Sequence, residues 1–213
     1  MRPARRHHPL HHPVALAAAA VVALVGTYLV AIRRPVPQAE LDLTKTINDA
    51  PDVVAHTLWP VMQLGSVWGP IVVALAVLAF VRDKLLAATV VLTGIVTWFA
   101  AKGVKEIVDR GRPRAYLPEI IVREGRGTGL GYISGHSAVA AATAVVAATA
   151  LPPKARPAIA LVALAVGIAR IVYGVHLPAD VIGGWSFGIL MGLGGVEISE
   201  QIRARRAPAG TRD

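Results

Sequence analysis

Long uncharged blocks of apolar residues alternate with short polar segments along the whole chain. The blocks are residues 14–32, 58–81, 85–101, 137–151, 158–175 and 178–196, the last two interrupted only by Arg170 and Asp180. A helix needs about 20 predominantly apolar residues to cross the hydrocarbon core of a membrane. Most blocks approach or exceed this length, and 137–151 is the shortest. The pattern predicts an all-α fold, an integral membrane helical bundle with about six transmembrane helices.

Six spans would place both termini on one side of the membrane, together with the loops at 82–84 and 152–157. The other side would then receive the segments 33–57, 102–136 and 170–178. Segment 33–57 mixes acidic and apolar residues, which predicts an interfacial helix broken by Pro51. No chemistry is assigned to this segment, and its His56 is interpreted as an ordinary interfacial residue.

Composition agrees with a membrane protein, because 54% of the residues are hydrophobic and only 16% are charged. A soluble domain would carry about a quarter charged residues. The first apolar block is too long for the core of a secretion signal, and the RRPVP that follows offers no small-x-small cleavage site, so we interpret it as an uncleaved span. The chain has no cysteine and therefore no disulfide framework.

The net charge of +9 does not indicate a nucleic-acid partner, because the basic residues form short clusters at the ends of spans. Such clusters mark loops held on the cytoplasmic face. Lysine and arginine divide equally between the two sides. Lys105, Arg112 and Arg170 have another explanation. Without these three residues, lysine and arginine are in slight excess on the side of the termini, which predicts that the termini are cytoplasmic. The cluster His7, His8, His11 and His12 is interpreted as part of a loose cytoplasmic tail, because prolines on both sides of His11 and His12 prevent an aligned metal site.

Three groups of polar residues would converge on the side opposite the termini. They are Lys105 with Arg112, Ser134 with Gly135 and His136, and Arg170 with His176 and Asp180. Three cations can neutralise a phosphate. One histidine can attack phosphorus, the carboxylate can fix its tautomer, and the other histidine can protonate the leaving group.

Local sequence supports this division of roles. Pro178 favours the first turn of a helix, so His176 should precede the last span and Asp180 should lie in its first turn. The carboxylate could then accept a hydrogen bond from the proton-bearing ring nitrogen and leave the other nitrogen free. Ser134 is a candidate N-cap for the fourth span, whose free N–H groups could bind an anion. Gly135 would let the backbone approach a phosphate closely.

The order and spacing of these residues resemble the type 2 phosphatidic acid phosphatase superfamily of integral membrane lipid phosphatases. Its first motif, a lysine followed after six residues by Arg-Pro, is matched from Lys105 to Arg112-Pro113. Its second motif, Pro-Ser-Gly-His, corresponds to residues 133–136. Its third motif, Ser-Arg, then His after five residues and Asp after three more, corresponds to residues 169–180. The chain departs from the pattern at Ile133 and Ala169, and the lost serine hydroxyl of Ala169 is expected to lower activity without abolishing it.

The resemblance implies that His176 is the nucleophile of a phosphohistidine intermediate, that Asp180 orients it, and that His136 is the general acid. The residues implied to hold the phosphate are Lys105, Arg112, Ser134, Gly135 and Arg170. The implied enzyme is a metal-independent phosphatase with no cofactor, and its site lies near the outer surface in bacterial members. The corresponding domains are a basic cytoplasmic tail (1–13), a six-span phosphatase domain (14–200) and a basic C-terminal tail (201–213).

The expected partners are the bilayer and a lipid phosphate: phosphatidic acid, phosphatidylglycerophosphate or, slightly favoured, a polyprenyl diphosphate. Two other functions stay open, a lipid phosphotransferase of the same superfamily and a transporter with intramembrane charges. A structural alternative is an Arg170–Asp180 ion pair that only stabilises packing. The glycines between 125 and 131 predict a flexible outer loop that could cover the site, and the alanines of 138–150 predict close helix packing.

Overall fold

The structure is a computed structural model that describes Leu10 and residues 12–206 of the chain. Most of the predicted N-terminal tail, including His7, His8 and His11, lies outside the described residues, as do residues 207–213 of the predicted C-terminal tail. Residues 201–206 of that predicted tail form the end of the last helix.

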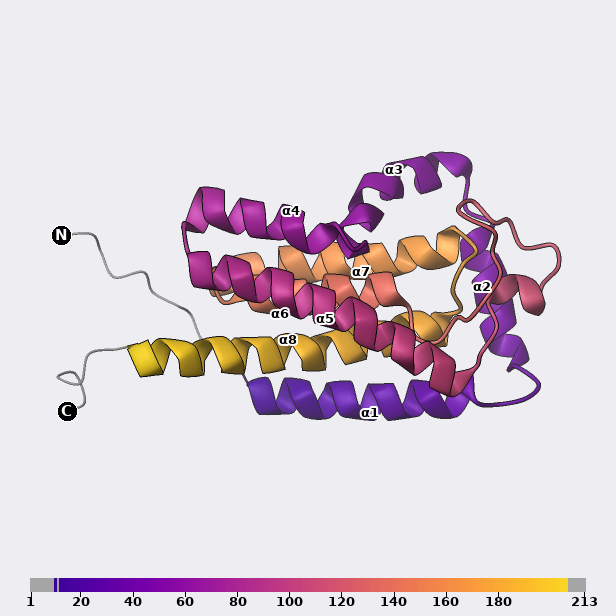
Figure 1. The fold of residues 1–213 in the computed structure, drawn as a ribbon. Coiled ribbons are helices and arrows are strands. Elements are labelled where there is room, and N and C mark those ends of the chain that lie inside the picture. Colours follow the sequence, from indigo (N-terminus) through magenta and orange to yellow (C-terminus); the bar gives the residue numbers. More distant parts are fainter. Residues whose placement is uncertain (1–9, 11, 207–213) are drawn as a thin grey trace.

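All regular elements of the described chain are helices, and they run back and forth through one bundle (Figure 1). The α-helices are α1 (Pro13–Ala31), α2 (Gln38–Asn48), α3 (Asp52–Met62), α4 (Gly69–Ala76), α5 (Lys84–Val108), α6 (Gly135–Ala148), α7 (Arg156–Val172) and α8 (Pro178–Arg206). A π-helical turn over Val77–Val81 extends α4.

The predicted membrane-spanning class is confirmed, although two of the six predicted spans differ in form. Helices α1, α5 and α8, and α7 together with the short turn before it, are each long and apolar enough to cross a membrane. Helices α3 and α4 pass the same test only as a pair bent by 80°. Helix α6 has 14 residues, fewer than a complete crossing needs.

The bend between α3 and α4 has a local cause in the sequence. Pro60 interrupts the hydrogen bonding of α3, and Gly69 turns so tightly that a Cβ there would lie 1.9 Å from the Leu64 carbonyl oxygen. Gly65, within the bend, approaches α6 closely, because a Cβ on it would lie 2.5 Å from the His136 carbonyl oxygen. The broken span therefore packs against the beginning of α6.

The three connecting segments predicted to share one side do lie together at one end of the bundle (Figure 1). Helix α2 lies across this end, and the beginning of α1 and the end of α8 lie at the opposite end. As predicted, Pro51 separates two helices in this region, and His56 is exposed. Asn48 fixes α2 in place, because its buried amide donates to the carbonyls of Ile121 and Val172 and accepts from the Ile121 N–H.

The predicted close packing of the alanine-rich helix is confirmed at the contact between α6 and α8. Ten of the 14 residues of α6 are buried. On α8, Gly184 and Gly188 face this helix so closely that a Cβ on Gly188 would lie 2.1 Å from the Ala138 carbonyl oxygen. Small residues allow the two backbones to meet, and this contact places the first turns of both helices side by side.

Adding one methyl group at this contact should therefore destabilise the protein. We expect Gly188→Ala to lower the free energy of unfolding by about 1–3 kcal/mol, as overpacking does. Gly194→Ala on the same helix is the matched control, because a Cβ there meets nothing within 4 Å. Unfolding of both purified variants in one detergent measures the difference, and equal stabilities would contradict the packing argument.

Candidate active site

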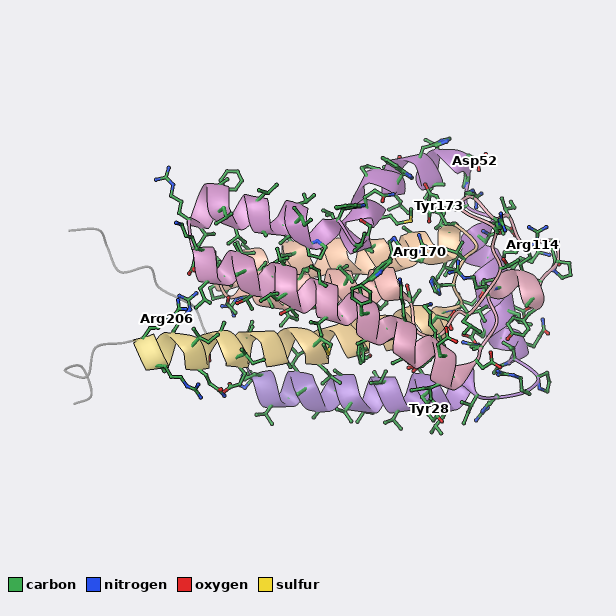
Figure 2. The ribbon with its side chains drawn as sticks, viewed as in Figure 1. Tyr28, Asp52, Arg114, Arg170, Tyr173 and Arg206 are labelled. Carbon is green, nitrogen blue, oxygen red and sulfur yellow. The ribbon has the colours of Figure 1, made fainter. Side chains whose placement is uncertain are left out.

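A cavity of about 220 Å³ opens at the end of the bundle that α2 covers, among α5, α6 and α7. Six of the eight predicted site residues line it: Lys105, Arg112, Gly135, His136, Arg170 and His176. The other lining residues are Trp98, Ala101 and Lys102. Figure 2 shows Arg170 at the same end of the bundle as Tyr173 and Asp52, whereas Arg206 lies at the opposite end. The structure thus brings the three predicted groups together.

His176 lies in the turn between α7 and α8 and is only 2% exposed. As predicted, Pro178 begins α8 and Asp180 lies in its first turn. The His176 Nδ1 is 3.4 Å from Asp180 Oδ2, which also accepts a 2.9 Å hydrogen bond from the Leu177 N–H. Burial lowers the pKa of His176 well below its ordinary value, and nearby Lys105, Arg170 and Arg112 lower it further. The imidazole is therefore neutral at neutral pH.

Asp180 is fully buried and is held by Arg110, which sequence reasoning missed. The Arg110 Nη1 lies 2.9 Å from Asp180 Oδ1, and the Arg110 side chain has no exposed surface. Its other partner is Glu40 of α2, which also accepts a 2.9 Å hydrogen bond from the Ala179 N–H. Burial opposes the charge of Arg110, but Asp180 and Glu40 outweigh it and raise the pKa of Arg110.

Segment 33–57, to which the sequence analysis assigned no chemistry, contributes a residue to the surroundings of His176. Glu40 is joined through Arg110 to the carboxylate beside His176. The sequence did contain a signal, because Glu40, Thr44 and Asn48 repeat every four residues and share one face of α2, and all three are buried. Polar residues on the buried face of an interfacial helix indicate partners inside the protein.

Arg170 pairs with Glu124 and not with Asp180, so the alternative of an Arg170–Asp180 ion pair is not observed. Arg170 is 5% exposed, and its Nε has no hydrogen-bond partner among the described residues. Glu124 begins the glycine-rich loop, in which Gly125, Gly127 and Gly129 have φ values of 65°, 65° and 93°. These left-handed turns return the chain towards the site.

Backbone carbonyls hold the other two predicted cations. The Lys105 ammonium donates to the carbonyls of Leu130 and Gly131, and the Arg112 Nε donates to Leu130. A Cβ on Gly131 would lie 2.8 Å from Asp180 Oδ2, so only glycine fits between these groups. The segment after the glycine-rich loop thus organises both cations and the carboxylate.

Ser134 is the N-cap of α6, as predicted, and its hydroxyl accepts from the Ser137 N–H. It is fully buried and does not line the cavity, whereas Gly135 does. A Cβ on Gly135 would meet the Trp98 ring at 3.8 Å, an ordinary van der Waals distance, so packing alone does not require glycine at this position. His136 follows, and its ring packs edge-on against the Trp98 ring at 5.6 Å between centroids.

The cavity is suited to an anion. Its charged lining side chains are Lys102, Lys105, Arg112 and Arg170, without a lining carboxylate. The described residues contain no cluster of three or more His, Cys, Asp or Glu side chains arranged to hold a metal ion. Buried guanidinium groups and a helix N-terminus are the groups that bind phosphate oxygens in proteins.

Fold and site together define a membrane-embedded helical bundle with a histidine-containing anion site at one end. The chain belongs to the PAP2 superfamily, whose family model matches residues 84–203. The predicted resemblance to the type 2 phosphatidic acid phosphatases is thereby confirmed.

An undecaprenyl-diphosphatase of Sulfolobus acidocaldarius is 29% identical over 123 residues, which are 57% of this chain and 58% of that protein. The chain therefore aligns with little more than half the length of this relative. The fold resembles the crystal structure of a transmembrane PAP2 type phosphatidylglycerolphosphate phosphatase from Bacillus subtilis, with a TM-score of 0.65 and 19% identity, covering 94% of this chain and all of the other. It also resembles Aquifex aeolicus LpxE, with a TM-score of 0.66 and 22% identity, covering 74% of this chain and 94% of the other.

The Glu40–Arg110–Asp180 arrangement predicts that α2 stabilises the site. Glu40→Ala leaves the buried Arg110 partly uncompensated and should cost about 3–5 kcal/mol of unfolding free energy. Asp42→Ala is the matched control on α2, because Asp42 is exposed and its carboxylate accepts a hydrogen bond from the exposed Gln38, the one partner of that carboxylate among the described residues. Thermal unfolding of the purified variants measures the effect, and a Glu40→Ala protein as stable as Asp42→Ala would refute this role.

Proposed function

We propose that this protein is a lipid phosphatase that hydrolyses a phosphate or diphosphate ester through a phosphohistidine at His176. The observation that carries the proposal is the position of His176. Its neutral ring lies in the wall of a cationic cavity, with a buried carboxylate beside Nδ1. A neutral imidazole has a lone pair available for attack on phosphorus.

In the first step, the ring nitrogen opposite Nδ1 would attack phosphorus. Asp180 would accept a hydrogen bond from the Nδ1–H group and stabilise the positive charge that develops on the ring. Lys105, Arg112 and Arg170 would neutralise the phosphate oxygens. The unpaired Arg170 Nε is a buried donor available for one of them. The α6 N-terminus at Gly135 would offer its free N–H groups to another oxygen.

The leaving group would depart on the side away from His176, because phosphoryl transfer is in line. His136, also in the cavity wall, would hold a proton once the negative charge of a bound phosphate lies beside it, and would pass this proton to a departing alkoxide. In the second step, a water molecule would attack the phosphohistidine and pass its proton to His136. The electron pair of the nitrogen–phosphorus bond would return to His176. The three cations would supply the charge stabilisation that a divalent metal supplies elsewhere, so the proposed reaction needs no metal.

The substrate would be a lipid phosphate whose tail stays in the bilayer, because the cavity lies at the end of a membrane bundle. Among such lipids we favour a polyprenyl diphosphate. The undecaprenyl-diphosphatase relative supports this choice, whereas the Bacillus subtilis structure, named for phosphatidylglycerolphosphate, keeps glycerolipid phosphates as candidates. The phosphatase domain would comprise residues 14–200, with the basic segment 1–13 before it and the basic segment 201–213 after it, of which residues 201–206 continue α8.

The proposal predicts metal-independent turnover of a lipid phosphate. Purified protein in detergent with EDTA should release phosphate from a polyprenyl diphosphate or a glycerolipid phosphate. His176→Ala should abolish release, and Asp180→Asn should leave a low rate, because the imidazole loses its tautomer control. Gly194→Ala serves as the neutral variant. Turnover restricted to soluble phosphomonoesters, dependence on added divalent ions, or full activity of His176→Ala would each contradict the proposal.

We also propose that the site opens on the outer face of the membrane, because the basic residues are in slight excess beside the termini. The chain has no cysteine, so single cysteines can report the orientation. Thr128 and Lys154 are both exposed and lie in connections at opposite ends of the bundle. In intact cells, Thr128→Cys should react with a membrane-impermeant thiol reagent and Lys154→Cys should not. The reverse pattern would place the site on the cytoplasmic face.

A further inference from the structure

Lys102 is a fourth cation of the cavity that none of the three motifs contains. It lies on α5 one turn before Lys105, and both side chains line the cavity. Trp98, Lys102 and Lys105 stand at positions i, i+4 and i+7 and so share one face of the helix. This stripe leads from the apolar part of α5 towards the buried cations.

Two aromatic rings hold the Lys102 ammonium. It lies 5.6 Å from the centroid of Trp98 and 5.5 Å from that of Phe99, distances typical of cation–π contacts. The same Trp98 ring contacts His136. Among the described residues, Lys102 has no carboxylate partner in an ion pair. A lysine on a membrane-spanning helix needs a partner or a task, because its charge is costly in lipid.

The exposure of these side chains distinguishes the mouth of the cavity from its inner end. His176 is 2% exposed, whereas Lys102 is an exposed side chain and Phe99 beside it is 63% exposed. Lys102 therefore lies at the mouth, next to an aromatic side chain that faces the surroundings of the bundle. His176 lies at the inner end. A substrate whose terminal phosphorus reaches His176 would direct its leaving group towards Lys102, because phosphoryl transfer is in line.

We propose that Lys102 binds the second phosphate of a lipid diphosphate and so sets a preference for diphosphates over monophosphates. The inference rests on the proposed phosphatase function and specifies its substrate. The terminal phosphate would bind to the three motif cations, Lys105, Arg112 and Arg170. The phosphate next to the lipid tail would contact the Lys102 ammonium, and the tail would leave past Phe99 into the bilayer.

The chemistry of the first step gives Lys102 a task with a diphosphate alone. The bond between the terminal phosphorus and the bridging oxygen breaks as the bond from His176 to phosphorus forms. The electron pair goes to the bridging oxygen, and a lipid monophosphate departs with one additional negative charge. That charge develops next to Lys102 and needs no proton from His136. A monophosphate substrate has no phosphate at this position, and its departing alkoxide depends on His136.

The test compares kcat/KM for a polyprenyl diphosphate and a glycerolipid monophosphate in wild type and Lys102→Met. Methionine keeps an unbranched apolar stem and removes the charge. We expect the ratio of diphosphate to monophosphate kcat/KM to fall about 10-fold to 100-fold, which corresponds to one lost charge-assisted hydrogen bond. Lys102→Arg should retain most of the wild-type ratio. Lys84→Ala, at the other end of α5 and exposed, should keep the wild-type ratio.

A binding measurement separates this role from general effects on catalysis. In the monophosphate assay, methylenediphosphonate should inhibit wild type more strongly than inorganic phosphate does, and Lys102→Met should lose most of that difference. If Lys102→Met lowers kcat/KM for the diphosphate and the monophosphate equally, or lowers neither, Lys102 only contacts lipid headgroups. That result would overturn the inference and leave the phosphatase proposal intact. A wild-type protein that hydrolyses neither lipid would overturn the proposed function itself.

Discussion

The site depends on one guanidinium that has no contact with solvent. Arg110 lies between Glu40 of the interfacial helix α2 and Asp180 at the beginning of α8. An arginine buried without partners would be prohibitively costly, so both carboxylates must be in place for this end of the bundle to close. Because Asp180 then lies beside His176 and Glu40 accepts the Ala179 N–H, the same ion cluster fixes the helix that presents the histidine.

Close packing of small residues performs the corresponding task inside the membrane. Gly184 and Gly188 let α8 touch the backbone of α6, and Gly65 lets the bent α3–α4 span approach His136. Helix α6 can be shorter than the membrane is thick, because the helices around it shield it from lipid. Its N-terminus consequently lies inside the bundle end, where a helix dipole and free N–H groups can act on an anion.

Much of this arrangement could be predicted from the sequence, because it follows from local signals. Uncharged blocks predicted the spans, Pro178 predicted the start of α8, and Ser134 predicted the cap of α6. Glu40, Arg110 and Glu124 could not be placed in the same way. Each depends on a contact between segments 46 to 70 residues apart in the chain, and each lies in a polar segment with several other charges of the same sign. Patterns of hydropathy do not identify which of those charges is buried, and the four-residue spacing of Glu40, Thr44 and Asn48 indicates a buried face of α2 without identifying its partner. The 80° bend was missed for a different reason, because residues 58–81 form one uncharged apolar block and hydropathy alone does not register the turn that Pro60 and Gly69 produce within it.

The charges around His176 are separated into two groups with opposite sign. Behind the ring, Asp180 and Glu40 carry two negative charges against the single positive charge of Arg110. In front, Lys105, Arg112 and Arg170 carry three positive charges, of which Glu124 offsets one. A proton on Nδ1 is therefore stabilised by Asp180, whose Oδ2 lies 3.4 Å away. In the low dielectric of a membrane protein, such a fixed field acts strongly and requires no reorganisation when an anion arrives. Burying these cations without a counter-ion costs free energy, and a bound phosphate would neutralise their charge. The same buried charges would therefore favour the binding of an anion.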